Sequence, residues 1–158
     1  MESFKLIPYS KKYKNEVFPT LVPDSLYHRY TSTSFIYLFL SFLNLYKTSL
    51  YVLIDENNNR IIGSIAFRKK INIKKLKFSW YIYGVAISEE ERGKGYGRIL
   101  MNNALAWCAM KKIKRVYLKV AGNNIPAIEL YNKMGFLPKS SGNNYGADIL
   151  FVKEIESV

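Results

Sequence analysis

Runs of apolar and β-branched residues, separated by polar turns, predict β-strands in the N-terminal half. Phe4 to Ile7 is the first such run, and Pro8, which has no N–H to donate, is expected to end it. Ser49 to Ile54 and Ile61 to Phe67 flank the polar segment Asp55 to Asn59. Because aspartate and asparagine favour tight turns, these two runs are predicted to form an antiparallel hairpin.

Four further strands are predicted beyond the hairpin. Phe78 to Ile87 is apolar nearly throughout, a pattern that indicates a central strand buried on both faces. Apolar and polar residues alternate from Arg115 to Val120, as in a strand with one buried face. The last two strands are predicted to start at Phe136 and to cover Ile149 to Val152, on either side of a turn rich in asparagine and glycine.

The segment between the first strand and the hairpin predicts two helices. A small helix is expected over Lys11 to Val17, and Asp24 is the predicted cap of a second helix that extends to Tyr46. Apolar residues are so dense in this second helix that it is expected to be buried or to face a partner. Its longest apolar stretch, Phe35 to Tyr46, is far shorter than the roughly 20 residues of a bilayer span, so no membrane span is predicted.

Two amphipathic helices are predicted in the C-terminal half. The first extends from about Gly97 to Lys111, and Leu100, Ala104, Trp107 and Cys108 share its apolar face.

The second amphipathic helix has clear start and stop signals. Asn124 is the predicted N-cap, Pro126 lies in the first turn, and Gly135 supplies a left-handed stop. Its apolar stripe consists of Ala127, Leu130, Tyr131 and Met134. The order of all these elements predicts an α/β fold, with one mixed central β-sheet, helices on both faces and a single domain that covers residues 1–158.

Composition fits one globular domain without disulfides. The chain has 158 residues, of which 49% are hydrophobic, and its single cysteine, Cys108, excludes an internal disulfide. A lone thiol and the lack of a secretory signal in Met1 to Ser10 favour a cytoplasmic location. The net charge of +12 would attract anions, but no aromatic-interleaved or helix-turn-helix pattern accompanies it, so specific nucleic-acid binding is not predicted.

The segment from Ile87 to Arg98 carries the candidate chemistry, because it joins an apolar strand to an amphipathic helix through Gly93, Gly95 and Gly97. Glycine permits positive φ and close approach of a ligand, and loop amides in front of a helix N-terminus form an anion site. The P-loop pattern is absent, and the Rossmann fingerprint would need glycine or alanine at Leu100 or glycine at Arg98. A purely structural turn is the alternative.

Arg92-x-x-Gly95-x-Gly97 resembles the R/Q-x-x-G-x-G/A signature of the GCN5-related N-acetyltransferases, the GNAT superfamily. A second match follows in register, Leu118-x-Val120-x-x-x-Asn124-x-x-Ala127-Ile128-x-Leu130-Tyr131-x-Lys133-x-Gly135-Phe136. Together the two matches cover about the C-terminal half, Phe78 to Phe136, whereas the N-terminal half resembles the family only in its order of elements.

The resemblance implies a GNAT fold and direct transfer of an acetyl group from acetyl-CoA to an amine in a ternary complex. The pyrophosphate of the cosubstrate would bind the backbone of Arg92, Gly93, Lys94, Gly95, Tyr96, Gly97 and Arg98. The preceding strand would bulge and splay from its neighbour, so that Val85, Ala86 and Ile87 contact the pantetheine arm. Gly84, which weakens a strand interior, suits such a bulge.

Three residues receive chemical roles from the resemblance. The backbone N–H of Val85 would donate to the thioester carbonyl oxygen, and Tyr131 would act as the general acid that protonates the CoA thiolate. Asn124 would contact the pantetheine or hold its helix. The plain alternatives are that Tyr131 is a core residue and Asn124 only a helix cap.

The general base is not assigned, because the strand position where several family members carry glutamate is Tyr81 here. Glu89 to Glu91 are interpreted as a solvated run, and Asp24 as a cap. His28 and a water chain remain as candidates. Cys108, on a core face without a basic partner, is not expected to be a nucleophile.

The sequence therefore predicts an acetyl-CoA-dependent N-acetyltransferase that acts on a primary amine of a small molecule and needs no metal. The alternatives are acetylation of a protein N-terminus or lysine, a non-catalytic CoA-binding module, and a nucleic-acid binder. The acceptor itself is not identified, although the charge of +12 argues against a polycation. A monomer and a homodimer are both compatible with the sequence.

Overall fold

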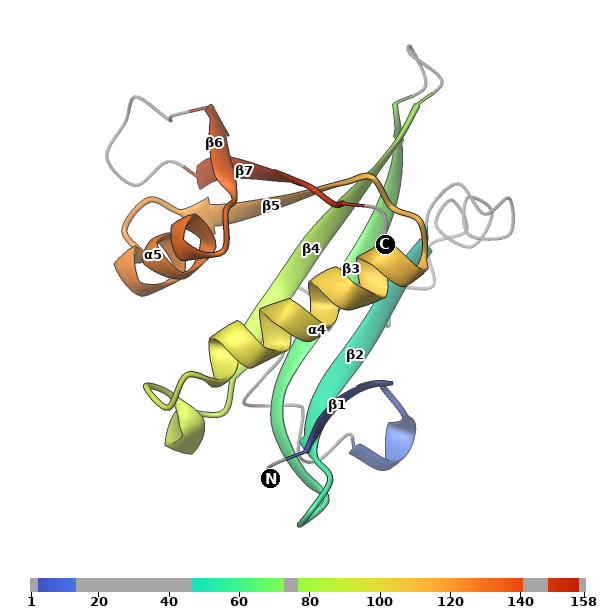
Figure 1. Cartoon of the computed structure of the whole chain (residues 1–158), viewed down its shortest axis with the longest axis vertical. Coiled ribbons are helices and arrows are strands. Elements are labelled where there is room, and N and C mark those ends of the chain that lie inside the picture. The colour runs from blue at the N-terminus through green and yellow to red at the C-terminus, as the bar shows by residue number, and fades with distance from the viewer. Residues whose placement is uncertain (1–2, 14–46, 73–76, 141–147, 157–158) are drawn as a thin grey trace.

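The computed structural model describes residues 3–13, 47–72, 77–140 and 148–156. Seven strands form one sheet in the order β1-β2-β3-β4-β5-β7-β6 (Figure 1). Their bounds are β1 (Phe4–Pro8), β2 (Lys47–Asp55), β3 (Arg60–Asn72), β4 (Lys77–Ile87), β5 (Arg115–Ala121), β6 (Leu137–Ser140) and β7 (Asp148–Glu154). Neighbouring strands are antiparallel except for β4 and β5, which are parallel. The predicted mixed sheet is confirmed.

The two α-helices among these residues pack on the same face of the sheet. Helix α4 (Tyr96–Met110) connects β4 to β5, and α5 (Ile125–Lys133) connects β5 to β6. Residues of both helices share one buried cluster with β5 and β7. The structure describes two 3₁₀-helices as well, η1 (Lys11–Tyr13) and η3 (Glu89–Glu91). No helix of the described residues is long and apolar enough to cross a membrane.

Some expected elements lie outside the described residues. The helix predicted over Lys11 to Val17 is seen only as η1, because the description stops at Tyr13. The helix predicted from Asp24 to Tyr46 and the turn between Gly142 and Gly146 fall entirely in undescribed segments.

Helix α4 is held on the sheet by its apolar face and by an aromatic cluster. Leu100, Met101, Ala104 and Cys108 are fully buried, which confirms the predicted stripe and adds Met101 to it. The Trp107 ring stacks on Phe67 of β3 with centroids 4.2 Å apart, and its Nε1 donates to the Tyr51 hydroxyl at 3.0 Å. Trp80 of β4 meets Trp107 edge to face at 6.0 Å. These contacts fix the helix across β2, β3 and β4.

A second buried cluster lies on the other face of the sheet, where Leu50, Val52 and Ala66 pack with Tyr13 and the half-buried Tyr83. Strand β4 is the middle strand, as predicted, but the prediction that it is buried on both faces is wrong. Only Ile82 is buried, whereas the rest of the strand is half-buried or exposed. β4 parts from β5 after Ile82, so its second half borders an opening, and Lys77 and Phe78 at its start are exposed before the pairing with β5 begins.

Gly63 of β3 provides a test of the close approach between β3 and β4. A Cβ at this position would lie 2.5 Å from the Ala86 carbonyl oxygen and 2.7 Å from Ile87 Cδ1. Because a backbone oxygen in a sheet cannot move without disturbing the pairing, Gly63→Ala should lower the free energy of unfolding by about 1–3 kcal/mol. Urea denaturation would measure the change, with Asn102→Ala on the exposed side of α4 as the control, expected within about 0.5 kcal/mol of wild type. Equal stabilities of the two variants would contradict this packing.

Candidate active site

An opening between β4 and β5 forms the base of the site. The two strands pair only at three positions, of which Ile82 with Leu118 is the last, although both continue beyond it. Next to the opening β4 bulges, because Ser64 pairs with Ala86 but Ala66 pairs with Tyr83, so one extra residue is inserted in β4. Gly84 has a φ of 56° at this bulge, a value that favours glycine. The bulge and the splay that the family resemblance implies are therefore present.

A cleft of about 610 Å³ lies over this opening, between the β4–α4 loop and α5. It brings together most of the predicted site residues: Val85, Ile87, Arg92, Gly93, Gly95, Tyr96, Gly97, Arg98, Asn124 and Tyr131. Two predicted residues do not line it. Ala86 packs against the cluster on the opposite face of the sheet, and the Lys94 ammonium turns to Glu91 instead.

The glycine loop has the backbone geometry of an anion site. Gly93 and Gly95 have φ values of 77° and 86°, and Gly95 is the N-cap residue of α4. The first N–H groups of a helix have no intrahelical acceptor, so those from Gly93 to Gly97 are available at this end of the cleft. The N–H groups of Arg92 and Arg98 already donate to the carbonyls of Glu89 and Gly95, at 3.2 and 3.0 Å. Arg92 and Arg98 line the same end, and the Arg92 Nε donates to the Ile87 carbonyl at 3.3 Å. Positive charge and free amides thus converge here.

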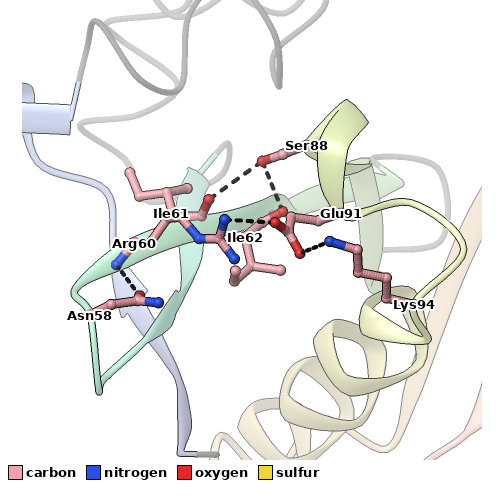
Figure 2. Close-up of polar contacts among 7 residues, drawn as sticks. All are labelled: Asn58, Arg60, Ile61, Ile62, Ser88, Glu91 and Lys94. Atoms are coloured by element: carbon pink, nitrogen blue, oxygen red, sulfur yellow. Dashed lines mark hydrogen bonds and ion pairs between the residues drawn. The ribbon is translucent and has the colours of Figure 1, made fainter.

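Glu91 fastens the loop to the β2–β3 hairpin. Its carboxylate is only 3% exposed and contacts the Arg60 Nη1 at 2.8 Å and the Lys94 Nζ at 3.2 Å (Figure 2). The Ser88 hydroxyl adds bonds to the carbonyls of Ile61 and Ile62, at 3.4 and 3.1 Å. The loop is therefore held to β3 through Ser88, which precedes η3, and Glu91, the last residue of η3.

The interpretation of Glu89 to Glu91 as a solvated run is correct for the first two residues and wrong for Glu91. The turn of η3 directs Glu91 inward, where its carboxylate also borders the cleft. The spacing to Lys94 was a local signal for one partner, but Arg60 lies on a distant strand that no local pattern connects to Glu91. Because Glu91 holds Lys94, Arg92 and Arg98 are the cations that face the cleft.

Tyr131 and Asn124 have the core and N-cap roles that the sequence allowed, and both also border the cleft. Tyr131 is 6% exposed and meets Phe136 edge to face at 5.8 Å, yet it also lines the cleft. Burial raises the pKa of Tyr131 from 10.0 to about 12, so its phenol stays protonated at neutral pH. The Asn124 Oδ1 accepts from the Ala127 N–H at 3.3 Å, which confirms the N-cap, and Asn124 also borders the cleft.

Three lining residues of α5 were not predicted as site residues: Pro126, Ala127 and Leu130. Sequence reasoning treated them as the helix start and its apolar stripe, which they are. Ala127 lies one helical turn before Tyr131 on the same face, and this spacing was the available signal. The stripe of α5 therefore forms both core and cleft wall.

No described residue is assigned as the general base. Burial raises the pKa of Tyr81, and the neighbouring phenols of Tyr83 and Tyr117 raise it further, so Tyr81 is neutral near pH 7 and does not replace a carboxylate. Asp24 and His28 lie outside the described residues. Burial also raises the pKa of the Cys108 thiol to about 12, so this thiol is not a nucleophile at neutral pH. Within the described ranges no cluster of His, Cys, Asp and Glu could hold a metal ion.

A family model described as the acetyltransferase (GNAT) family matches residues 15–136, well over half of the chain. The chain belongs to this family. The GNAT fold and the enzyme class predicted from the two motifs, an acetyl-CoA-dependent N-acetyltransferase, are those of the family, so both predictions are confirmed.

Relatives of this GNAT chain act on different kinds of acceptor. It is 30% identical over 121 residues to an N-alpha-acetyltransferase of Sulfurisphaera tokodaii, a match that covers 71% of this chain and 70% of that protein. It is 36% identical over 89 residues to a spermidine N(1)-acetyltransferase of Vibrio cholerae, covering 52% of this chain and 51% of the relative. A 40% identical match to a mycothiol acetyltransferase of Tsukamurella paurometabola spans only 19% of that protein's length.

Solved structures support the fold. The crystal structure of a Vibrio cholerae spermidine N-acetyltransferase, in complex with CoA and spermine, superposes with a TM-score of 0.70 at 20% identity and covers 96% of this chain and 95% of that one. The ribosomal-protein-S18-alanine N-acetyltransferase from Escherichia coli superposes with a TM-score of 0.66 at 11% identity, covering 99% and 96%.

The Glu91 contacts predict a loss of stability when its charge is removed. Glu91→Gln should lower the free energy of unfolding by about 1–3 kcal/mol, because two charge-assisted contacts of a buried group are weakened. The neighbouring Glu90 is exposed, so Glu90→Gln is a matched control expected within about 0.5 kcal/mol of wild type. Chemical denaturation of both variants, with Arg60→Met to complete a double-mutant cycle, measures the coupling. A coupling energy near zero between Glu91 and Arg60 would contradict the anchoring role.

Proposed function

We propose that this GNAT protein transfers the acetyl group of acetyl-CoA directly to the primary amine of a small molecule. The observation that carries the proposal is the continuity of one cleft, which runs from the glycine loop past the β4 bulge to Tyr131. An anion site, unpaired strand backbone and a protonated phenol are thereby aligned along a single surface.

The glycine loop is the proposed site for the diphosphate of the cosubstrate. Backbone amides from Gly93 to Gly97 would donate to it, and the guanidinium groups of Arg92 and Arg98 would add charge. Val85 and Ile87 line the cleft and present backbone groups that have no β5 partner, and these would pair with the amide groups of the pantetheine arm. Ala86 lies between them but pairs with Ser64 of β3, so its backbone faces away from the cleft. Asn124 and the apolar face of α5 would form the opposite wall.

Two groups of this chain would act on the reacting atoms. The Val85 N–H, at the bulge, would donate to the thioester oxygen as negative charge develops there. The Tyr131 phenol, protonated because burial raises its pKa, would deliver a proton to the departing thiolate. Attack of the neutral amine nitrogen on the thioester carbon forms the amide bond and breaks the carbon–sulfur bond. Sulfur takes the Tyr131 proton, and the proton that the nitrogen loses passes to solvent, from which the phenol is reprotonated.

The relatives favour an enzyme but leave two acceptor classes. The spermidine N(1)-acetyltransferase and a streptothricin acetyltransferase of Streptomyces lavendulae, 36% identical over 55 residues, are named for small molecules. The N-alpha-acetyltransferase supports acetylation of a protein N-terminus as the second candidate. A cytoplasmic location, a metal-free reaction and a monomer or homodimer belong to the same proposal.

Arg98 provides a test of the diphosphate site. It is exposed at the start of α4 and lines the cleft, so Arg98→Met should remove one charge-assisted contact and weaken binding of acetyl-CoA about tenfold. Isothermal titration calorimetry measures the affinity, and Lys111→Met, an exposed change at the other end of α4, is the control for lost net charge. An unchanged affinity in Arg98→Met would argue against this loop as the diphosphate site.

Substitution of Tyr131 tests its proposed role as the general acid. Tyr131→Phe should lower kcat by about 10²–10⁴-fold while the affinity for CoA changes little, since only the proton donor is removed. Because the pKa of the phenol lies near 12 rather than 10.0, wild-type kcat should show no loss from Tyr131 ionisation below pH 10. Steady-state rates over a pH series, together with a thermal melt to verify folding, check both points. A wild-type rate in the variant would remove Tyr131 from the mechanism.

A further inference from the structure

Three tyrosine rings form a cluster on the face of the sheet opposite α4 and α5. Trp80 and Ile82 of β4 pack toward α4, so the alternate residues Tyr81 and Tyr83 point to the other face. The ring centroid of Tyr81 lies 5.9 Å from that of Tyr83 and 5.3 Å from that of Tyr117 on β5. The cluster therefore borders the opening between β4 and β5 at its closed end.

The faces of these rings are occupied by the chain's own cations. The Lys70 Nζ lies 4.6 Å from the Tyr81 centroid and 5.3 Å from that of Tyr83. The Arg68 Cζ lies 4.5 Å from the Tyr83 centroid, and the Lys139 Nζ lies 5.1 Å from that of Tyr117. A cluster of tyrosines would suit an organic cation, but here each ring already has a cation of the chain within 5.1 Å of its centroid.

Carboxylates are scarce around this cluster. Of the described strand residues on this face, Glu154 pairs with Arg115, and Asp148 lies opposite Ala121, four residues or about 13 Å along β5 from Tyr117. Neither Lys70 nor Lys139 forms an ion pair among the described residues. The undescribed internal segments contain only two acidic residues, Glu16 and Asp24. The cationic character of the cluster is thus not neutralised by its described surroundings.

An acceptor would have to pass this cluster. The proposed thioester position lies beside Val85 and Tyr131, on the side of the sheet that α4 and α5 cover and that the bound cosubstrate would fill. The amine would then reach the thioester through the opening between β4 and β5 from the opposite face. Tyr83 directly precedes the Gly84–Val85 bulge, so it lies on this route.

We propose that the preferred acceptor is a small primary amine that also carries an anionic group, a carboxylate or a phosphonate, which Lys70 and Lys139 bind. This inference rests on the proposed function. The anionic group would meet cations without a described carboxylate partner, whereas a polyamine would place a second cation where the aromatic faces are taken and like charges repel. The same lysines would therefore select for one acceptor class and against the other.

The experiment compares amines of equal carbon number that differ in their second group: ω-amino acids, aminoalkylphosphonates, alkylamines and α,ω-diamines. Initial rates with acetyl-CoA should give kcat/KM values at least tenfold higher for the anionic members than for the diamine at the preferred chain length. The ratio should fall as salt is added. Calorimetric binding of the same compounds to the CoA-saturated protein provides a measurement that does not require turnover.

Two variants test the assignment to these lysines. Lys70→Glu, and independently the exposed Lys139→Glu, should each reduce the preference for the anionic amine over the diamine at least tenfold. Lys111→Glu changes the net charge equally at a distant exposed position and should leave the ratio unchanged. Because the two substitutions are on different strands, the same loss of preference in both variants would not be explained by a folding defect in one of them.

The outcomes separate the two proposals. Acetylation of diamines as fast as, or faster than, anionic amines would overturn the inference and leave the transferase in place. If no amine is acetylated, the proposed function fails, and the binding measurement still decides the inference. Equal affinities across the series, or no binding of any member, would overturn it.

Discussion

The early end of the β4–β5 pairing is the constraint on which the site depends. After Ile82 and Leu118 the two parallel strands diverge, so backbone groups that a continuous sheet would satisfy internally are directed into a cleft. The bulge at Gly84 bends β4 at the same place, and the glycine tolerates the positive φ that the bend requires. An extended ligand with its own amides is the natural partner for such a strand. The divergence of two strands, rather than any side chain, therefore creates the cleft.

The elements beside this opening, α4 and the loop before it, are fixed to the sheet by side-chain contacts. Helix α4 is pinned across β2 to β4 by Trp107, and the loop at its start is tied to β3 by Ser88 and Glu91. Burying the Glu91 carboxylate would be unfavourable by itself, but Arg60 and Lys94 neutralise it. Because Lys94 is engaged in this way, the cleft receives its charge from Arg92 and Arg98. The residues that fix the loop, Glu91 and Lys94, therefore alternate along one short segment with those that line the cleft.

Local signals made much of this arrangement predictable. The glycines of the loop, the Asn124 cap and the stripe that contains Tyr131 are each encoded by residues that are close together in the sequence, and the structure has them where the patterns predicted. The two incorrect predictions, the exposure of Glu91 and the burial of β4, have a common cause in tertiary contacts. Glu91 is buried by Arg60 from a distant strand, and β4 is half-exposed because its neighbour diverges, which the apolar composition of β4 alone does not reveal. The base has no local signal, since Tyr81 stands at the expected position.

The aromatic packing under α4 has a spectroscopic consequence. The chain contains two tryptophans, and their rings lie 6.0 Å apart in one cluster with Phe67. Indole emission from the whole molecule therefore originates at a single locus, where α4 meets the sheet. Intrinsic fluorescence would follow detachment of α4 from β3 and β4, while circular dichroism would follow the strands themselves. Divergence of the two signals during unfolding would reveal whether the helix leaves before the sheet opens.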